Sequence, residues 1–248
     1  HRDLHSFPTR RSSDLLHARD EQGQPTYRKE IYARLIGSIR EACPEAIICV
    51  SLSGRTFETF EQRADVLFLS GDLKPDMASL TLASMNFHHA ASVNSPEMIQ
   101  RLAERMTDSG IKPELEIFDS GMVNYACFLA DRGIIQPPFY FNFIFGNVAT
   151  AQAKPLQVGL LMSELPPGAL WTGGGIGAFQ LEMNIMGMLY GNGVRVGLED
   201  NLWLDPERKH LASNVQLMQR VRDTAGLLRK RIATPLETRK ALGLSLHA

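Results

Sequence analysis

The sequence predicts an α/β fold: a (β/α)8 TIM barrel lacking its first β/α unit. Seven strand-like segments occur along the chain, and nearly every one is followed by a helix-like segment. Strict alternation of this kind predicts a parallel sheet. A full barrel takes about 250 residues, which the 248-residue chain would slightly exceed with an eighth unit added. An open, doubly wound sheet is the alternative.

Runs of apolar and β-branched residues indicate the strands. They lie at 15–20, 46–50, 77–82, 113–118, 139–145, 169–172 and in the run from 193 that carries Arg195. Helical spacing of apolar residues and start signals indicate the helices. They lie at 27–42, 57–69, 96–110, 121–132, 152–163, 178–190, 205–228 and from 235 onward. Ser95 and Thr234, each followed by proline, are predicted to cap two of them.

Polar side chains near the ends of the predicted strands favour the barrel over the open sheet. They are His17, Ser51, Ser79, Thr81, Glu114, Glu116, Glu199 and Asp200. A barrel brings the carboxyl ends of all its strands to one mouth, whereas an open sheet spreads them along an edge. We therefore expect these side chains to form one site.

The composition is that of an ordinary globular domain. The chain is 44% hydrophobic and 21% charged, with a formal net charge of -1. This balance gives no reason to expect nucleic acid or a membrane surface as a partner. The three cysteines, Cys43, Cys49 and Cys127, have no close metal-ligand spacing, and no apolar run is long enough to cross a bilayer. We therefore expect a cytoplasmic protein.

The first residues do not fit the pattern of the rest. The stretch 5–15 is similar to one reading frame of a common sequencing adapter, and it has no amphipathic period. We expect residues 1–15 to be non-native and residues 16–248 to form a single, incomplete barrel domain that carries catalysis.

The run that starts at Gly193 concentrates charge at the end of a buried strand. Arg195 and the adjacent pair Glu199 and Asp200 need partners there: each other, a metal or a substrate. A simple ion pair that closes the strand end is the alternative. If the chain stays extended, Glu199 and Asp200 point to opposite sides and have different tasks.

Other residues allow weaker predictions. His17 at a strand end is either a structural histidine or, with a glutamate, part of a divalent metal site that leaves positions open for substrate. The glycine-rich run 173–177 is predicted to be a loop at a strand-to-helix junction, where phosphate could bind. It lacks the usual phosphate-binding spacings, so this signal is weak.

Several short motifs together resemble the β-keto acid cleavage enzymes, the family of the 3-keto-5-aminohexanoate cleavage enzyme of lysine fermentation. The similarity covers about residues 16–244. The motifs lie at 16–20 with Gly23 and Pro25, 50–51, 86–87, 113–116, 120–122, 194–201 and 233–237. No single motif is specific, but the combination is.

The resemblance implies a zinc-dependent (β/α) barrel that acts as an acyltransferase and assembles as a homo-oligomer. It condenses a β-keto acid with acetyl-CoA and yields acetoacetate and a new acyl-CoA. In the family, two histidines on one strand and a glutamate hold the zinc ion (Zn²⁺). His17 matches the second histidine and Glu199 the glutamate, whereas the first histidine falls on Leu15.

The resemblance also assigns catalytic and substrate-binding residues. Asp200 matches the catalytic aspartate, Arg195 its supporting arginine and Ser51 the active-site serine. Ser79, Thr81 and Glu116 are expected to contact the substrate. A glutamate on the family's first strand has no counterpart here, so the identity of the keto acid stays open. A metal-dependent retro-aldol lyase or hydrolase on the same barrel, and an inactive fragment, are the alternatives.

Overall fold

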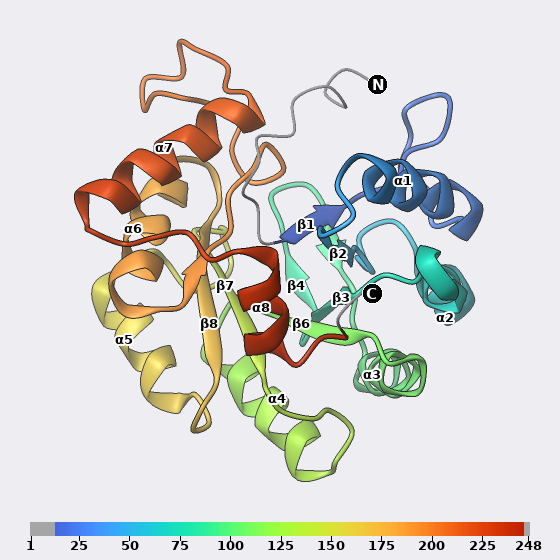
Figure 1. Cartoon of the computed structure of the whole chain (residues 1–248). Coiled ribbons are helices and arrows are strands. Elements are labelled where there is room, and N and C mark those ends of the chain that lie inside the picture. Colours follow the sequence, from blue (N-terminus) through green and yellow to red (C-terminus); the bar gives the residue numbers. More distant parts are fainter. Residues whose placement is uncertain (1–12, 246–248) are drawn as a thin grey trace.

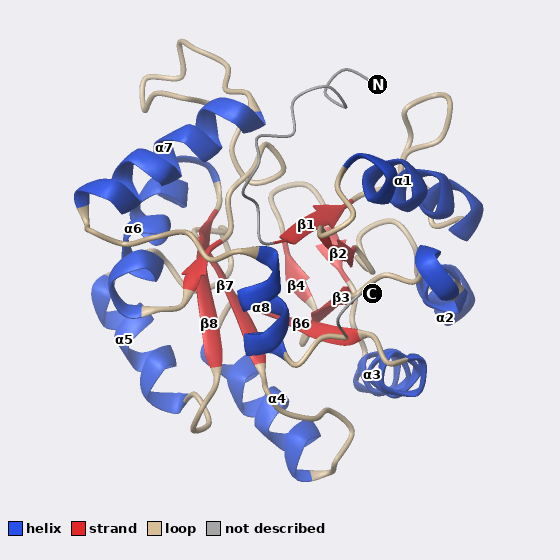
Figure 2. Ribbon diagram, viewed as in Figure 1, coloured by secondary structure: helices blue, strands red, loops and turns tan. Residues whose placement is uncertain are grey.

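The computed structural model describes residues 13–245, and its centre is a curled parallel sheet of seven strands (Figures 1 and 2). Each strand of this sheet pairs with the next strand of the same sheet along the chain. The strands are β1 (Ser13–Leu16), β2 (Ile47–Val50), β3 (Met77–Thr81), β6 (Lys112–Ile117), β7 (Tyr140–Phe145), β8 (Leu170–Gly175) and β9 (Gly193–Val194). The predicted α/β class and parallel sheet are confirmed. The sequence did not predict the small antiparallel hairpin of β4 (Met85–Asn86) and β5 (Ala91–Ser92).

Helices follow the strands, and Figure 1 shows α1 to α7 arranged around the outside of the curled sheet. They are α1 (Lys29–Ala42), α2 (Phe60–Ala64), α3 (Pro96–Ser109), α4 (Ser120–Asp131), α5 (Pro155–Glu164), α6 (Gln180–Tyr190), α7 (Asn214–Leu227) and α8 (Pro235–Leu242). The predicted caps Ser95 and Thr234 are confirmed, because each side chain accepts a backbone N–H. The helix predicted from 205 instead begins at Asn214, where Ser213 and Gln216 form a capping box.

The curl brings the two ends of the sheet together. In the described residues, β1 and β9 are the edge strands and are not paired with each other. Even so, His17 after β1 lies 3.0 Å from Glu199 after β9, between the imidazole Nε2 and a carboxylate oxygen. The carboxyl ends of the first and last strands therefore face one mouth, as the barrel interpretation predicts. The absence of a first β/α unit stays a prediction. So does the non-native origin of residues 1–15, of which 1–12 lie outside the described residues.

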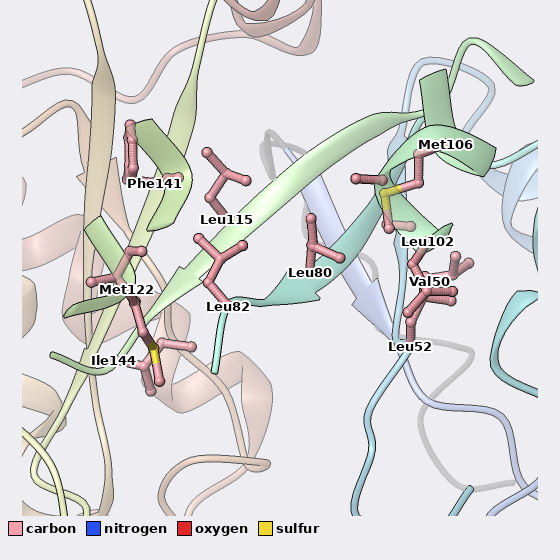
Figure 3. Packing of buried hydrophobic residues seen from close by; sticks show 14 of the residues in the cluster. Val50, Leu52, Leu80, Leu82, Leu102, Met106, Leu115, Met122, Phe141 and Ile144 are labelled. Atoms are coloured by element: carbon pink, nitrogen blue, oxygen red, sulfur yellow. The ribbon is translucent and has the colours of Figure 1, made fainter. Parts of the chain in front are cut away.

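Apolar side chains pack on both faces of the sheet. The larger cluster joins the outer face to the surrounding helices, and Figure 3 shows part of it, including Leu80, Leu115 and Phe141 on three neighbouring strands. A smaller cluster fills the inside of the curl with Ile47, Cys49, Met77 and Leu242. Because Leu242 belongs to α8, this helix covers the end of the sheet where the strands begin.

A buried ion pair fastens α8 in this place. The Arg239 guanidinium donates to both carboxylate oxygens of Asp76, at 2.6 and 3.2 Å, and to the carbonyl of Ala46. Asp76 also accepts the Ile48 N–H and a contact from Arg40 of α1. These contacts join the amino ends of neighbouring strands to the last helix.

The glycine-rich run is not the predicted loop. Gly173 and Gly175 belong to β8, and a Cβ on Gly173 would lie 2.2 Å from the Met183 carbonyl of α6. Glycine is therefore needed there so that α6 can pack closely against the strand. None of the described helices is both long and apolar enough to cross a membrane.

Candidate active site

A polar cavity of about 120 Å³ lies at the carboxyl ends of the strands. Its walls come from almost every strand end of the sheet. The lining residues are His17, Ser51, Ser53, Arg55, Thr81, Met85, Phe87, Ser92, Glu116, Phe118, Ile144, Ile176, Arg195, Glu199 and Asp200. The structure thus brings together all the predicted catalytic, substrate-binding and metal-binding residues except Ser79.

Arg195 is the centre of the cavity's charge arrangement. Its Nε donates to Asp200 Oδ2 at 2.8 Å, its Nη2 to Glu199 Oε2 at 2.7 Å and its Nη1 to Glu116 Oε1 at 3.2 Å. The Arg195 side chain is only 12% exposed, so its ion pairs with Glu116 and Asp200 are shielded from water, whereas Glu199 is 33% exposed. The three carboxylates together raise the pKa of the guanidinium, although burial by itself lowers it.

The prediction that Glu199 and Asp200 point to opposite sides is wrong. It assumed an extended chain, but β9 ends at Val194 and the residues that follow turn, with the Asp200 N–H donating to the Gly197 carbonyl. The turn lets both carboxylates reach Arg195. Their environments still differ, because Glu199 also meets His17, whereas both oxygens of Asp200 are held by Arg195.

Glu199 and Asp200 have opposite pKa shifts. Burial raises the pKa of Glu199, but Arg195, His17 and Arg55 outweigh this effect and lower it to about 2. Burial also raises the pKa of Asp200, and here the opposing effect of Arg195 is not sufficient, so the pKa stays above its usual range. A carboxylate with a raised pKa is better suited to take up and return a proton. Arg195 therefore orients Asp200 without holding the pKa of this carboxyl below its usual range.

His17 and Glu199 are the two candidate metal ligands. Tetrahedral zinc with ligands at 2.0–2.1 Å separates neighbouring donor atoms by about 3.3 Å, and the 3.0 Å between His17 Nε2 and Glu199 Oε2 is close to this value. The described residues contain no cluster of three or more metal-ligating side chains. The donors present therefore suit zinc chemically but supply two of the three protein ligands of a typical catalytic site.

Three smaller polar residues complete the predicted set. The Thr81 hydroxyl donates to Glu116 Oε2 at 2.5 Å, so Glu116 is held from both sides by Thr81 and Arg195. Ser51 lines the cavity at the start of the loop after β2. Ser79 does not line it; its hydroxyl accepts the Leu52 N–H and so supports this loop.

Glu114 lies inside the sheet and does not line the cavity. Its Oε1 accepts the Asn142 amide at 2.8 Å, and its Oε2 accepts the Cys49 thiol at 3.4 Å. Burial raises the pKa of Glu114 to about 7, against the opposing effect of Arg195. Because strand residues two apart share a face, Glu114 supports the site from the layer next to Glu116.

Glu114→Gln is expected to stabilise the protein at neutral and alkaline pH but not at acidic pH. A carboxyl whose folded pKa is raised destabilises the fold once the pH exceeds its unfolded value of about 4.5. The cost is complete above about pH 7 and amounts to at most about 3 kcal/mol. Urea unfolding at pH 5 and pH 8.5 measures it. We expect the free energy of unfolding of the variant, relative to that of the wild type, to be higher at pH 8.5 than at pH 5. An equal difference at both pH values would contradict a raised pKa of Glu114.

A second, larger cavity of about 630 Å³ adjoins the first. Five residues line both cavities: His17, Ser51, Ser53, Arg55 and Glu199. Much of the remaining wall comes from the loops after β1 and β2, including Arg19, Tyr27 and Phe57, and the helices α1 and α2 contribute Tyr32 and Arg63. The small polar cavity is therefore continuous with a larger space that has cationic and aromatic walls.

The sequence interpretation missed two groups of cavity residues. Arg55 was not among the predicted site residues, although an arginine four residues after the candidate Ser51 was a usable signal. The apolar wall of Met85, Phe87, Phe118 and Ile144 gave no signal, since apolar residues at strand ends are most often core.

Fold and site together define an α/β enzyme whose charged cavity lies at the carboxyl ends of a curled parallel sheet. Residues 15–244 match the beta-keto acid cleavage enzyme family, and the chain belongs to this family. Characterised relatives are named as enzymes, and three of those compared are named as transferases that act with acetyl-CoA. The chain is therefore an enzyme with transferase activity.

Two kinds of relative illustrate the range of the family. The 3-keto-5-aminohexanoate cleavage enzyme of Acetoanaerobium sticklandii is 37% identical over 231 residues, covering 93% of this chain and 83% of the relative. The enzyme of the same name from Fusobacterium nucleatum is 38% identical, with 92% and 82% covered. The 3-oxoadipate:acetyl-CoA acetyltransferase of Cupriavidus necator is 34% identical, with 92% and 80% covered.

Solved structures support the fold. ObcA in its binary complex with oxaloacetate superimposes with a TM-score of 0.81 at 19% sequence identity, covering 96% of this chain. The chain spans 64% of the length of that ObcA chain. Apo ObcA gives a TM-score of 0.78 at 19% identity, with 94% of this chain and 61% of that chain covered.

Proposed function

We propose that this enzyme condenses a β-keto acid with acetyl-CoA and releases acetoacetate and a new acyl-CoA, with zinc as its metal. The observation that carries the proposal is the buried arrangement in which Arg195 holds Asp200 at the cavity beside Glu116 and Glu199. Family membership supplies the reaction type. In this proposal, the TIM barrel lacking its first unit is the scaffold.

Asp200 is the general base of the proposed reaction. The carbon between the two carbonyl groups of a β-keto acid carries its most acidic C–H, and Asp200 takes this proton. The resulting carbanion attacks the acetyl thioester, so a C–C bond forms and the C–S bond breaks. The released thiolate then attacks the original keto carbon and forms a new C–S bond. The bond between that carbon and the former carbanion breaks, and Asp200 returns the proton to give acetoacetate.

The other residues bind and orient the substrate. Ser51 donates a hydrogen bond to the substrate carboxylate or to the oxyanion that develops during attack. Thr81 and Glu116 contact the substrate next to Ser51. Their side chains are held in place by the hydrogen bond between them and by the contact of Glu116 with Arg195. Ser79 acts indirectly in this scheme, because it supports the loop that carries Ser51.

His17 and Glu199 would hold the zinc ion. When bound there, zinc supplies Lewis-acid stabilisation of negative charge on the keto and carboxylate oxygens. Arg195 keeps Glu199 ionised and pointed at His17, so the two donors stay on one side of the cavity.

Leu15→His is expected to increase zinc affinity at least about 10-fold. Leu15 precedes His17 by two residues and contacts the inner cluster, so both side chains face the inside of the curl. Calorimetric zinc titration measures the change, and Leu15→Gln is the control because its amide is a poor zinc ligand. Equal affinity of both variants would contradict the placement of the metal at His17 and Glu199.

The larger cavity is the proposed place for the coenzyme A arm. It opens directly beside Ser51 and His17, and its Arg19 and Arg55 provide positive charge for a polyanionic ligand. The test of the proposed function is acetoacetate formation by the purified chain from β-keto acids, with and without acetyl-CoA. Formation that requires acetyl-CoA would support it, whereas product formed equally without acetyl-CoA would favour the lyase or hydrolase. A cytoplasmic location and a homo-oligomer stay predictions.

A further inference from the structure

The carboxylates of the small cavity already have cationic partners. Both oxygens of Asp200 accept from Arg195, and Glu116 accepts from Arg195 and Thr81. Glu199 meets Arg195, His17 and Arg55. A positively charged group on a substrate would therefore have to compete with Arg195 for each of them.

The cations of the cavity are used unequally. Arg195 directs all three of its nitrogens at carboxylates, so it has little capacity for an incoming anion. Arg55 makes only long contacts, at 3.5 Å to Glu199 and 3.4 Å to the Ser53 hydroxyl. Its side chain is 43% exposed. Among the described residues that line this cavity, Arg55 is thus the arginine best able to bind a substrate carboxylate.

The remaining wall of the cavity is apolar. It comprises Met85, Phe87, Phe118, Ile144 and Ile176. Phe118, Ile144 and Ile176 lie at the ends of β6, β7 and β8, away from the loop after β2 that carries Arg55. Phe87 connects the two regions, because its ring centroid lies 5.0 Å from the Arg55 guanidinium carbon and its ring packs edge-to-face with Phe118.

We infer that the enzyme selects β-keto acids with a short, neutral, apolar acyl group, and that Arg55 binds their carboxylate. This inference rests on the proposed function and adds the substrate class. The acyl group lies against Phe118, Ile144 and Ile176, three apolar side chains that offer no polar partner to a buried ammonium or second carboxylate. The preference therefore differs from the substrates named for two of the relatives, an amino-substituted acid and a diacid.

Three β-keto acids with the same six-carbon chain test the preference. They are 3-oxohexanoate, which is neutral beyond its carboxylate, 3-keto-5-aminohexanoate, which carries an ammonium, and 3-oxoadipate, which carries a second carboxylate. We expect kcat/KM for acetyl-CoA-dependent acetoacetate formation to be at least about 10-fold higher for 3-oxohexanoate than for either charged acid. A charged acid used as well as the neutral one would overturn the inference and leave the proposed function standing. No acetoacetate from any of the three would refute both.

Two pairs of variants locate the determinants. Ile176→Glu adds a carboxylate to the apolar wall. It is expected to raise kcat/KM for 3-keto-5-aminohexanoate relative to that for 3-oxohexanoate at least about 10-fold, whereas Ile176→Gln should leave this ratio unchanged. Arg55→Gln is expected to raise KM for the keto acid at least about 10-fold with little change in kcat, and Arg55→Lys to recover part of the loss. Ligand-observed NMR of keto acid binding without acetyl-CoA gives a readout independent of turnover. Unchanged binding in Arg55→Gln would overturn the role of Arg55.

Discussion

Asp200→Asn is expected to lower kcat about 10³-fold, within the range contributed by general acid–base catalysis. Asparagine keeps the shape of the side chain and one oxygen for the Arg195 guanidinium, but it cannot accept the proton from the keto acid. The side chain of Asp200 is buried beside Arg195, so a water molecule does not easily replace it. The loss should appear in kcat more than in KM, because Asp200 acts on the reacting carbon.

Proton exchange separates catalysis by Asp200 from a structural effect. In D2O without acetyl-CoA, the wild type should exchange the protons between the two carbonyl groups of the keto acid faster than the uncatalysed rate. Asp200→Asn should lose this exchange. Asp205→Asn is the control, because Asp205 binds the Lys209 and His210 N–H groups of an exposed loop and should retain full turnover. Exchange at the wild-type rate in Asp200→Asn would show that another group is the base.

Arg239→Met is expected to lower the free energy of unfolding by about 3 kcal/mol, the usual cost of removing one partner of a buried ion pair. Asp76 and Arg239 are only 5% and 4% exposed, and they join α8 to the amino ends of the strands. Burial raises the pKa of Asp76, but Arg239, the Ile48 N–H and Arg40 outweigh this and lower it. The contribution of the pair is therefore present at neutral pH and is lost as the pH falls through the folded pKa of Asp76.

A matched variant at an exposed ion pair tests whether the loss of stability in Arg239→Met depends on the burial of the pair. Arg231 makes a bidentate ion pair with Glu237 at 2.7 and 2.8 Å at the start of the same helix, but its side chain is 74% exposed. Arg231→Met should therefore cost much less stability than Arg239→Met in urea unfolding. Equal losses for the two variants would contradict the structural role assigned to the buried pair.

The fold and most of the site could be predicted because their signals are local. The alternation of strands and helices predicted the parallel sheet, and six of the eight polar residues at the predicted strand ends line the cavity. Ser79 was misplaced because a hydroxyl next to a strand end can serve either a substrate or a neighbouring loop, and here it binds the Leu52 N–H. Spacing along the chain does not distinguish these two cases.

Other features depend on contacts that no local pattern shows. Because the chain turns at Gly197, the side chains of Glu199 and Asp200 both reach Arg195. The sequence does not show that the extended strand β9 already ends at Val194. The glycines of β8 were predicted to form a loop, but glycine is needed there because α6 packs closely against the strand. This contact involves a later part of the chain, so the glycine-rich run by itself does not reveal it. The role of Arg55 in binding a substrate carboxylate depends on a contrast in three dimensions: its contact with Glu199 is long, at 3.5 Å, whereas Arg195 binds the same residue at 2.7 Å.

The most direct test of the proposed reaction follows carbon from acetyl-CoA labelled with ¹³C in both acetyl carbons. The reaction proposed for Asp200 places both labelled carbons in the carbonyl and methyl positions of acetoacetate and leaves the new acyl-CoA unlabelled. Carbon-13 NMR of the products distinguishes these positions. Unlabelled acetoacetate, or label in the acyl group of the new thioester, would contradict the account.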